Sequence, residues 1–332
     1  MSTTRYGDVG VSPRTNVYAA RQMLKHAGPV IVLDRFGLTK PLPQNSTQII
    51  SFRRPRVFDA VTVPLQEGIT PTATSFRYDN VEVQIKQYGQ VVETTDVIQD
   101  THEDPVLNDA AQQAGENIGR SKEALTYGVV RAGTSVIYQN GSDRTDVNTP
   151  ISLSKIRAAT RFLRAQKAAM FTRILDGSVN YATRPIEASY MAVGHTDLDA
   201  DIRLLPGFTP VAEYGSRATA HEYEVGSVEN VRFILTPDLG PWINAGGTAN
   251  GMMSTGGSDA DVYPLLIFGR EAYGIVPLRG KNAVSPTILP PGQKTKSDPL
   301  GQRGYVGWKM WHASIILNEL WMTRIETAAT SL

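Results

Sequence analysis

The chain has 332 residues, of which 41% are hydrophobic and 20% are charged, and its formal net charge is +1. This composition is typical of a folded globular protein that can bury a core, arranged as one large or two modest domains. Cysteine is absent, which excludes disulfides and thiolate chemistry, and no apolar run approaches the roughly 18 residues that a membrane-spanning helix needs.

The first 45 residues are predicted to form an arm rather than a domain. A short helix is expected over residues 15–26, followed by a brief apolar run at 30–33 and an extended, proline-bearing connector at 41–46. These segments contain too few apolar residues to form a core of their own. The arm is therefore not expected to fold independently.

Strand signals dominate residues 47–98. Val81, Val83 and Ile85 alternate with polar neighbours, which is the period of a half-buried strand. Further strands are expected at 49–52, 57–63, 91–92 and 97–98, separated by turn signals at 67–71 and 88–89. A long hairpin of this kind is marginally stable alone and exposes unpaired backbone groups at its edges. Either the rest of the chain or another copy of the protein must therefore cover it.

Charge is unevenly distributed over these first segments. Residues 1–56 contain nine basic and two acidic side chains, whereas residues 57–110 contain ten acidic and two basic ones. The two stretches either form solvated faces of opposite sign or pair with each other, within one chain or across neighbouring copies. A nucleic-acid-binding arm ranks last, because residues 1–56 contain no motif that reads DNA or RNA. Under the pairing hypothesis, the contact residues between copies are Arg53, Arg54, Arg56, Glu67, Arg77, Asp79, Glu82 and Lys86.

The longest predicted element is a helix from Asp104 to about Ala132. Asp104 is typical of an N-cap, Pro105 of the first helical position, and Gly133 of a helix C-terminus. Apolar residues repeat at three- and four-residue spacing along one stripe, formed by Leu107, Ala111, Ala114, Ile118, Leu125 and Val129. At 1.5 Å per residue the helix is roughly 40 Å long. We interpret it as a rigid spine, and its alanines predict a partner surface that approaches closely.

A second helix is expected to follow, capped by Ser152 or Ser154. Its apolar stripe is formed by Leu153, Ile156, Ala159 and Leu163. Its exposed face carries the basic residues Arg157, Arg161, Arg164 and Lys167. A solvated surface is the simplest explanation of this basic face.

From Tyr190 to about Arg279 the pattern becomes α/β. Strands are expected at 190–193, 231–235, 263–268 and 273–278, with a helix that is capped by Thr196 and contains Leu198, Ile202 and Leu205. Residues 280–303 have the proline and lysine content of a connector. The tail from Gly304 to Ile325 fits both a strand with period 2 and a helical stripe, so periodicity leaves the two alternatives open.

The sequence gives no positive sign of catalysis. The glycine-rich loop at 245–258 lacks the lysine that a phosphate-binding loop needs, and the five histidines include no pair at i, i+4 spacing. The closest match to a metal site is the cluster of His195, Asp197, Asp199 and Asp201. Acids in the first turns of a helix are favoured by the helix dipole, which explains these aspartates without a metal. We therefore predict no catalytic, cofactor-binding or metal-binding residues.

Two stretches and the opening segment carry a resemblance to a known family. The first stretch contains Phe52-Arg53-Arg54, residues 60–71 (AVTVPLQEGITP) and Gln87-Tyr88-Gly89; the second contains residues 261–274 (DVYPLLIFGREAYG), 298–304 (DPLGQRG) and Gly307-Trp308-Lys309. With Thr4-Arg5-Tyr6-Gly7 at the start, they run in order along nearly the whole chain. In this combination the sequence resembles the major capsid proteins of tailed phages of the N-four type.

The resemblance implies an α+β chain with the Hong Kong 97-like capsid fold. It assigns residues 1–46 to an N-terminal arm, 47–103 to an extended β-hairpin loop and its base, 104–189 to a peripheral domain built on the spine helix, 190–280 to an axial domain, and 281–332 to a connector and a return to the peripheral domain. Because the family's tail returns as a strand, the resemblance favours period 2 for that segment.

The implied function is structural. Proteins of this family assemble as pentamers and hexamers into an icosahedral shell around double-stranded DNA, which they contact non-specifically, and they have no catalytic residues, cofactors or membrane partner. The resemblance also allows separate scaffolding, portal and cement proteins, with assembly in the host cytoplasm and a final location in the virion. Two alternatives are kept: an α/β enzyme that holds a ligand with its glycine-rich loop, and a minor or decoration protein of the virion.

Overall fold

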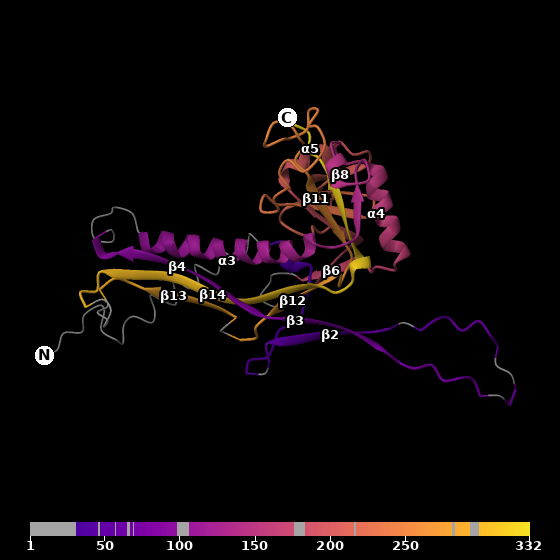
Figure 1. Ribbon diagram of the computed structural model, residues 1–332, viewed down its shortest axis with the longest axis horizontal. Coiled ribbons are helices and arrows are strands. Elements are labelled where there is room, and N and C mark those ends of the chain that lie inside the picture. Colours follow the sequence, from indigo (N-terminus) through magenta and orange to yellow (C-terminus); the bar gives the residue numbers. More distant parts are fainter. Residues whose placement is uncertain are drawn as a thin grey trace.

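The computed structural model describes residues 31–45, 47–56, 58–64, 67–68, 70–97, 106–175, 183–215, 217–280, 283–292 and 299–332. The helix predicted at 15–26 and the N-cap pair Asp104-Pro105 lie outside the described residues. The molecule is elongated (Figure 1): a long helix lies along one sheet, a compact body contains a second sheet, and a β-hairpin projects away from both.

The described helices are α3 (Val106–Arg131), α4 (Leu153–Ala165) and α5 (Asp199–Arg203), with 3-10 turns η1 (Leu33–Arg35), η2 (Arg144–Asp146), η3 (Thr196–Leu198), η4 (Val211–Glu213) and η5 (Glu319–Trp321). The strands in the first half are β1 (Leu38–Thr39), β2 (Ile49–Pro55), β3 (Tyr78–Gln84), β4 (Lys86–Thr95), β5 (Val136–Tyr138), β6 (Phe171–Leu175) and β7 (Thr183–Gly194). The remaining strands are β8 (Phe208–Pro210), β9 (Glu224–Val228), β10 (Val231–Leu235), β11 (Tyr263–Phe268), β12 (Tyr273–Pro277), β13 (Val284–Leu289), β14 (Arg303–Ile316) and β15 (Met322–Thr327).

The five-stranded sheet is built around β14, which pairs antiparallel with β4, β12 and β13, while β1 joins β12 in parallel. The tail is therefore a strand, which decides between the two alternatives in favour of period 2. The spine α3 lies along this sheet (Figure 1). Their shared core consists of Ala111, Ala114, Ile118, Ile288, Val306, Trp308 and Met310. The alanines let helix and strand approach closely, as the predicted stripe requires.

The stripe of α3 changes character toward its C-terminal half. Leu125 and Val129 are only half-buried, whereas Glu123 and Thr126 are fully buried beside Val130. The predicted stripe was wrong here, because a pattern drawn from apolar residues misses buried polar side chains that find hydrogen-bond partners. The helix ends at Arg131, close to the predicted C-terminal glycine.

Three local strand predictions were wrong. Tyr88 and Gly89 do not interrupt the sheet but lie within β4, where a Cβ on Gly89 would lie 2.7 Å from the carbonyl oxygen of Trp308. The glycine is thus needed for close approach of two strands, not for a turn. Described residues between 58 and 63 form no strand, because the ladder of the hairpin ends where Pro55 pairs with Tyr78. β4 ends at Thr95 and Val97 is not part of a strand, whereas Ile98, the other half of the strand predicted at 97–98, lies outside the described residues.

A further correction concerns the predicted connector at 280–303. Part of it forms β13, because residues 284–289 pair with β14. The predicted strands at 231–235 and 263–268 are confirmed as β10 and β11, and the strand at 190–193 is the end of the longer β7.

The eight-stranded sheet forms the centre of the compact body. Its order is β5-β15-β11-β7-β10-β9-β8, with β6 added to β7. α4 and α5 cover one face, where Ile156, Ala159, Leu163, Leu198 and Ile202 are buried against the sheet. The other face is covered by the end of α3 and by arm residues, including Val32, Leu33 and Phe36. The arm therefore contributes to the core of the body.

Two helix caps differ from the predictions. Ser152 precedes α4, but its hydroxyl makes no capping bond and instead accepts from Gln139 Nε2 at 2.8 Å. The N-cap before η3 and α5 is His195 rather than Thr196, since His195 Nδ1 accepts the N–H of Asp197 at 3.2 Å. Sequence alone does not favour an imidazole as a cap over a neighbouring threonine hydroxyl.

Glu123 fastens the arm to α3. Its carboxylate accepts the backbone N–H of Val32 at 3.1 Å and that of Leu33 at 2.9 Å. Next to it, Asp34 pairs with Lys122 Nζ at 2.6 Å and accepts the hydroxyl of Thr126 at 2.8 Å. Burial raises the pKa of Glu123 from 4.5 to about 7, with smaller opposing effects from the backbone bonds and further raising by the charges of Asp34 and Asp238.

We expect this raised pKa to make stability depend on pH. The folded protein prefers Glu123 protonated more than the unfolded chain does, so its favourable contribution is complete below about pH 4.5 and is lost as pH rises through 7. Glu123→Gln removes the titration. The difference in unfolding free energy between variant and wild type should therefore shift in favour of the variant by about 3 kcal/mol from pH 4.5 to 8, measured by denaturant unfolding. Glu116→Gln on the same helix is the control, and an equal shift there would contradict the assignment.

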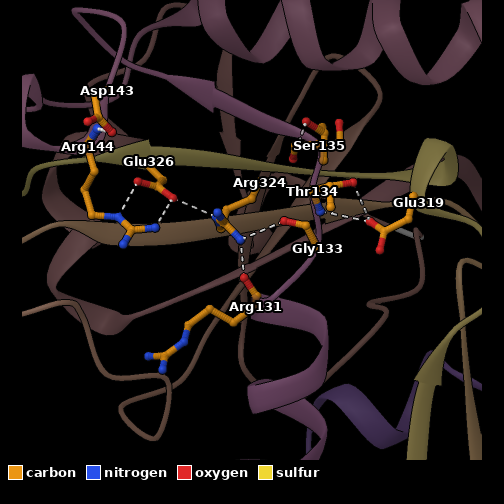
Figure 2. A network of polar contacts seen from close by, with 10 residues as sticks. Arg131, Gly133, Thr134, Ser135, Asp143, Arg144, Glu319, Arg324 and Glu326 are labelled. Atoms are coloured by element: carbon orange, nitrogen blue, oxygen red, sulfur yellow. Dashed lines mark hydrogen bonds and ion pairs between the residues drawn. The ribbon is translucent and has the colours of Figure 1, made fainter.

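A buried ion-pair network joins the end of α3 to the eight-stranded sheet (Figure 2). Glu326 on β15 accepts two bonds from Arg144, from Nε at 2.7 Å and from Nη2 at 2.8 Å, and one from Arg324 Nε at 2.8 Å. Arg324 Nη1 also donates to the carbonyl oxygens of Arg131 and Gly133, which lie at the C-terminus of α3. The guanidinium of Arg144 lies 3.8 Å from the ring centre of Trp242. One fully buried carboxylate thus holds two arginines in fixed positions.

Glu326→Gln should be strongly destabilising, because it leaves Arg324 and Arg144 without their counter-charge. Removing one partner of a buried pair costs about 3–5 kcal/mol. The matched control is Glu229→Gln, which breaks the exposed pair with Arg157 and should cost about 1 kcal/mol or less. Denaturant unfolding of the two variants checks the difference, and equal losses would refute the role of the network.

Candidate assembly interface

The projecting hairpin consists of β2 and β3, and its base is held by a small core. The two strands pair antiparallel from Ile49 opposite Gln84 to Pro55 opposite Tyr78. The side chains that anchor them to the five-stranded sheet are Leu42, Ile50, Phe52, Ile85 and Val276. Beyond Pro55 and Tyr78 the described residues continue away from the rest of the molecule (Figure 1). The base is therefore fixed, while the far part is not covered by any other described part of the chain.

Three aromatic side chains gather on the uncovered part. The ring centres of Phe58 and Phe76 are 5.9 Å apart, and those of Phe76 and Tyr78 are 4.7 Å apart with the rings nearly perpendicular. All three are exposed, at 53%, 54% and 53%. Val61 and Val63, further out, are 88% and 75% exposed. We call Phe58, Phe76 and Tyr78 the hairpin aromatic cluster.

Four of the predicted contact residues lie next to this cluster, at the end of the ladder between β2 and β3. Arg54 and Arg56 both face Asp79, with Nη2 atoms 3.8 and 3.2 Å from its carboxylate oxygens. The guanidinium of Arg53 lies 5.9 Å from the ring centre of Tyr78. Opposite charges therefore meet inside one chain at the end of the ladder, with two arginines on one carboxylate.

The other four predicted residues are separate from this group. Glu67 lies in a turn, Arg77 directly precedes β3, Glu82 lies within β3, and Lys86 begins β4. All four are exposed, and none forms an ion pair with another described residue. Their charges are available on the surface of the hairpin and its base.

Sequence reasoning missed the hairpin aromatic cluster. Phe58 and Phe76 are 18 positions apart, so no local pattern joins them. A signal was nevertheless present for Phe76, which lies among polar residues after a predicted bend, where an aromatic side chain has no core to enter.

The aspartates beside His195 have structural partners. Asp197 accepts the hydroxyl of Tyr263 at 2.7 Å, Asp199 pairs with Arg203 at 2.9 Å, and Asp201 accepts the N–H of Thr330 at 2.9 Å. Burial, followed by the contact with Asp197, raises the pKa of Tyr263. Among the described residues, no group of three or more ligating side chains is arranged to hold a metal ion.

The glycine-rich loop is braced by Asp261. Its buried carboxylate accepts the N–H of Asn244 at 2.8 Å and both the N–H and the hydroxyl of Thr255, at 3.0 and 2.6 Å. These bonds close the loop on itself.

No helix within the described ranges is long and apolar enough to cross a bilayer.

Comparisons with known proteins agree on one family. The family described as phage capsid protein matches residues 79–325. The major capsid protein of Pseudomonas phage KPP21 is 23% identical over 269 residues, which cover 75% of this chain and 68% of the relative. Among solved structures, the capsid of Ralstonia phage GP4 has a TM-score of 0.62 at 14% identity, covering 91% of this chain and 88% of that one. The capsid of cyanophage Pam1 has a TM-score of 0.61 at 13% identity, covering 92% and 93%.

The family match begins within β3 and ends within β15, so it includes the spine helix and most strands of both sheets. The similarity to solved phage capsids confirms the α+β, Hong Kong 97-like fold that the sequence resemblance implied. The chain therefore belongs to the phage capsid protein family.

Proposed function

We propose that the protein is a major capsid protein, a non-enzymatic subunit that assembles with copies of itself into an icosahedral shell. The observation that carries the proposal is the projecting hairpin, whose aromatic cluster lies outside the cores of its own chain. A two-stranded ribbon is marginally stable by itself. A neighbouring copy is the partner that a repeating shell supplies at every such position.

The hairpin aromatic cluster has the composition of a binding hot spot. Aromatic and arginine side chains are enriched at the centres of protein interfaces, where a few residues provide most of the affinity. Here three half-exposed aromatic rings stand beside arginines and outlying valines. We propose that this cluster is buried by the next copy. The charged residues then form the polar rim of the contact: Arg53, Arg54, Arg56, Glu67, Arg77, Asp79, Glu82 and Lys86.

The roles of the segments follow from the same proposal. Residues 1–46 act as the arm, 47–103 as the extended loop, 104–189 as the peripheral domain, 190–280 as the axial domain and 281–332 as the returning segment. Support comes from α3 lying along the sheet built on β14, and from the compact body around β11.

The proposal extends to the particle. Pentamers and hexamers enclose double-stranded DNA, the subunits reach the virion after assembly in the host cytoplasm, and separate scaffolding, portal and cement proteins take part where the particle needs them. Family membership supports this context.

Replacing Phe58 and Phe76 by serine should remove the centre of the contact. We expect the concentration needed for shell formation to rise by at least about tenfold, because hot-spot truncations cost 2 kcal/mol or more. The thermal midpoint of the unassembled protein should move by less than about 2 °C, since both side chains are exposed. Electron microscopy and light scattering measure assembly. The control is Leu204→Ser with Leu320→Ser, two exposed leucines elsewhere; shell yields equal to the control would reject the proposed contact.

Charge reversal tests the rim. Arg53, Arg54 and Arg56 replaced together by glutamate should impair assembly more than monomer folding, because exposed pairs such as Arg56 with Asp79 contribute about 1 kcal/mol or less to folding. Shell yield at several salt concentrations and the unfolding midpoint are measured side by side. Normal yield with unchanged salt sensitivity would show that these arginines do not contact a neighbour.

A further inference from the structure

A second surface, on α4, differs in character from the hairpin. Between residues 147 and 175 the chain contains six basic residues and no acidic one. Three of them, Arg157, Arg161 and Arg164, are spaced four and three residues apart and are exposed along one side of α4. Lys167 continues the row just after the helix. Figure 1 shows α4 on the outer side of the compact body. We call Arg157, Arg161, Arg164 and Lys167 the α4 basic strip.

The chain neutralises little of this charge. Arg157 pairs with Glu229 at 2.6 Å, and Arg164 donates to the neutral side-chain oxygen of Asn230 at 2.8 Å. Arg161 and Lys167 form no ion pair with any described residue. The bonds to Glu229 and Asn230 hold two guanidinium groups in place, so the strip is partly pre-oriented and still strongly positive.

The strip has no apolar anchor. The large exposed hydrophobic side chains of the described chain include none between residues 147 and 175, in contrast to the hairpin. Protein interfaces have apolar centres, and the strip offers no large apolar side chain from which to build one. A surface of cations alone instead fits a polyanion that presents only phosphates.

Length supports the same assignment. From Arg157 to the end of α4 at Ala165 the strip extends roughly 12 Å along the helix axis, and Lys167 follows two residues beyond. Each strand of duplex DNA presents one phosphate per roughly 3.4 Å of axis, so a row of four cations can face several phosphates at once. No base-reading geometry is needed for such a contact.

We infer that the α4 basic strip binds the phosphate backbone of duplex nucleic acid without sequence preference. The inference rests on the proposed function in one respect: packaged DNA is the duplex that the subunit meets in a shell. The two surfaces then have different partners. The hairpin aromatic cluster contacts copies of the chain, and the α4 basic strip contacts the packaged DNA.

The test uses the full-length protein and a fluorescent 30-bp duplex of mixed sequence, with binding followed by anisotropy at several salt concentrations. Arg161→Gln with Lys167→Gln removes two strip cations that lack an ion pair. The control, Arg203→Gln with Arg217→Gln, removes two exposed cations elsewhere. We expect the slope of log K against log salt to become shallower by roughly 0.9 for each strip cation removed and to stay unchanged in the control. Shell formation is measured by electron microscopy on the same samples.

The outcomes separate the two proposals. Weaker, less salt-dependent binding in the strip variant alone, with normal shells, supports the inference. Equal losses in both variants, or no duplex binding by the wild type at low salt, overturn it and leave the shell-forming role intact. Loss of shells in the strip variant alone also overturns it, because the strip is then a contact between copies. If the wild type forms no shells but binds the duplex, and the strip variant binds it less, the inference about the strip is supported and the shell-forming role is overturned.

Discussion

The close contact between α3 and β14 sets the geometry of the whole molecule. Ala111 and Ala114 bring the helix against a strand that also pairs with β4, β12 and β13. A 26-residue helix is roughly 40 Å long. The hairpin is anchored to the same sheet, so its distance from the compact body is fixed by this contact and not by any loop.

Buried polar groups, in addition to apolar packing, hold α3 to the rest of the molecule. Glu123 fastens the arm to α3, and Glu326 fastens the end of α3 to the eight-stranded sheet. Both carboxylates are fully buried, but among the described residues only Glu326 has cationic partners. The joint at Glu326 is consequently rigid, whereas the joint at Glu123 changes strength with protonation. A change of pH therefore affects the contact between α3 and the arm, at Glu123, more than the contact between the end of α3 and the eight-stranded sheet, at Glu326.

Much of the fold could be predicted because many segments have a local sequence pattern that matches the structure they form in the folded protein. β10 and β11 match their predictions to the residue, since a continuous apolar run bounded by turns has few other uses. Prediction failed where the structure of a segment depends on a partner far away in the sequence. Gly89 leaves room for the backbone of Trp308, and residues 284–289 form a strand because they pair with β14. In the candidate interface, charge counting singled out Arg54, Arg56 and Asp79, which pair with each other within the chain, and their contact with a neighbouring copy stays a prediction. Charge counting could not find the aromatic cluster, because contact between Phe58 and Phe76 depends on the hairpin's register.

The position of the last strands has a consequence for synthesis. β14 is the strand that unites the five-stranded sheet, and β15 lies between β5 and β11 inside the other. Both are synthesised after all the other strands of their sheets, so neither sheet can close until residues 303–327 have left the ribosome. The hairpin emerges early, but its base stays unfinished until β14 has been made. Nascent chains that lack β14 and β15 therefore cannot offer a complete surface to one another, so the order of the strands discourages premature association.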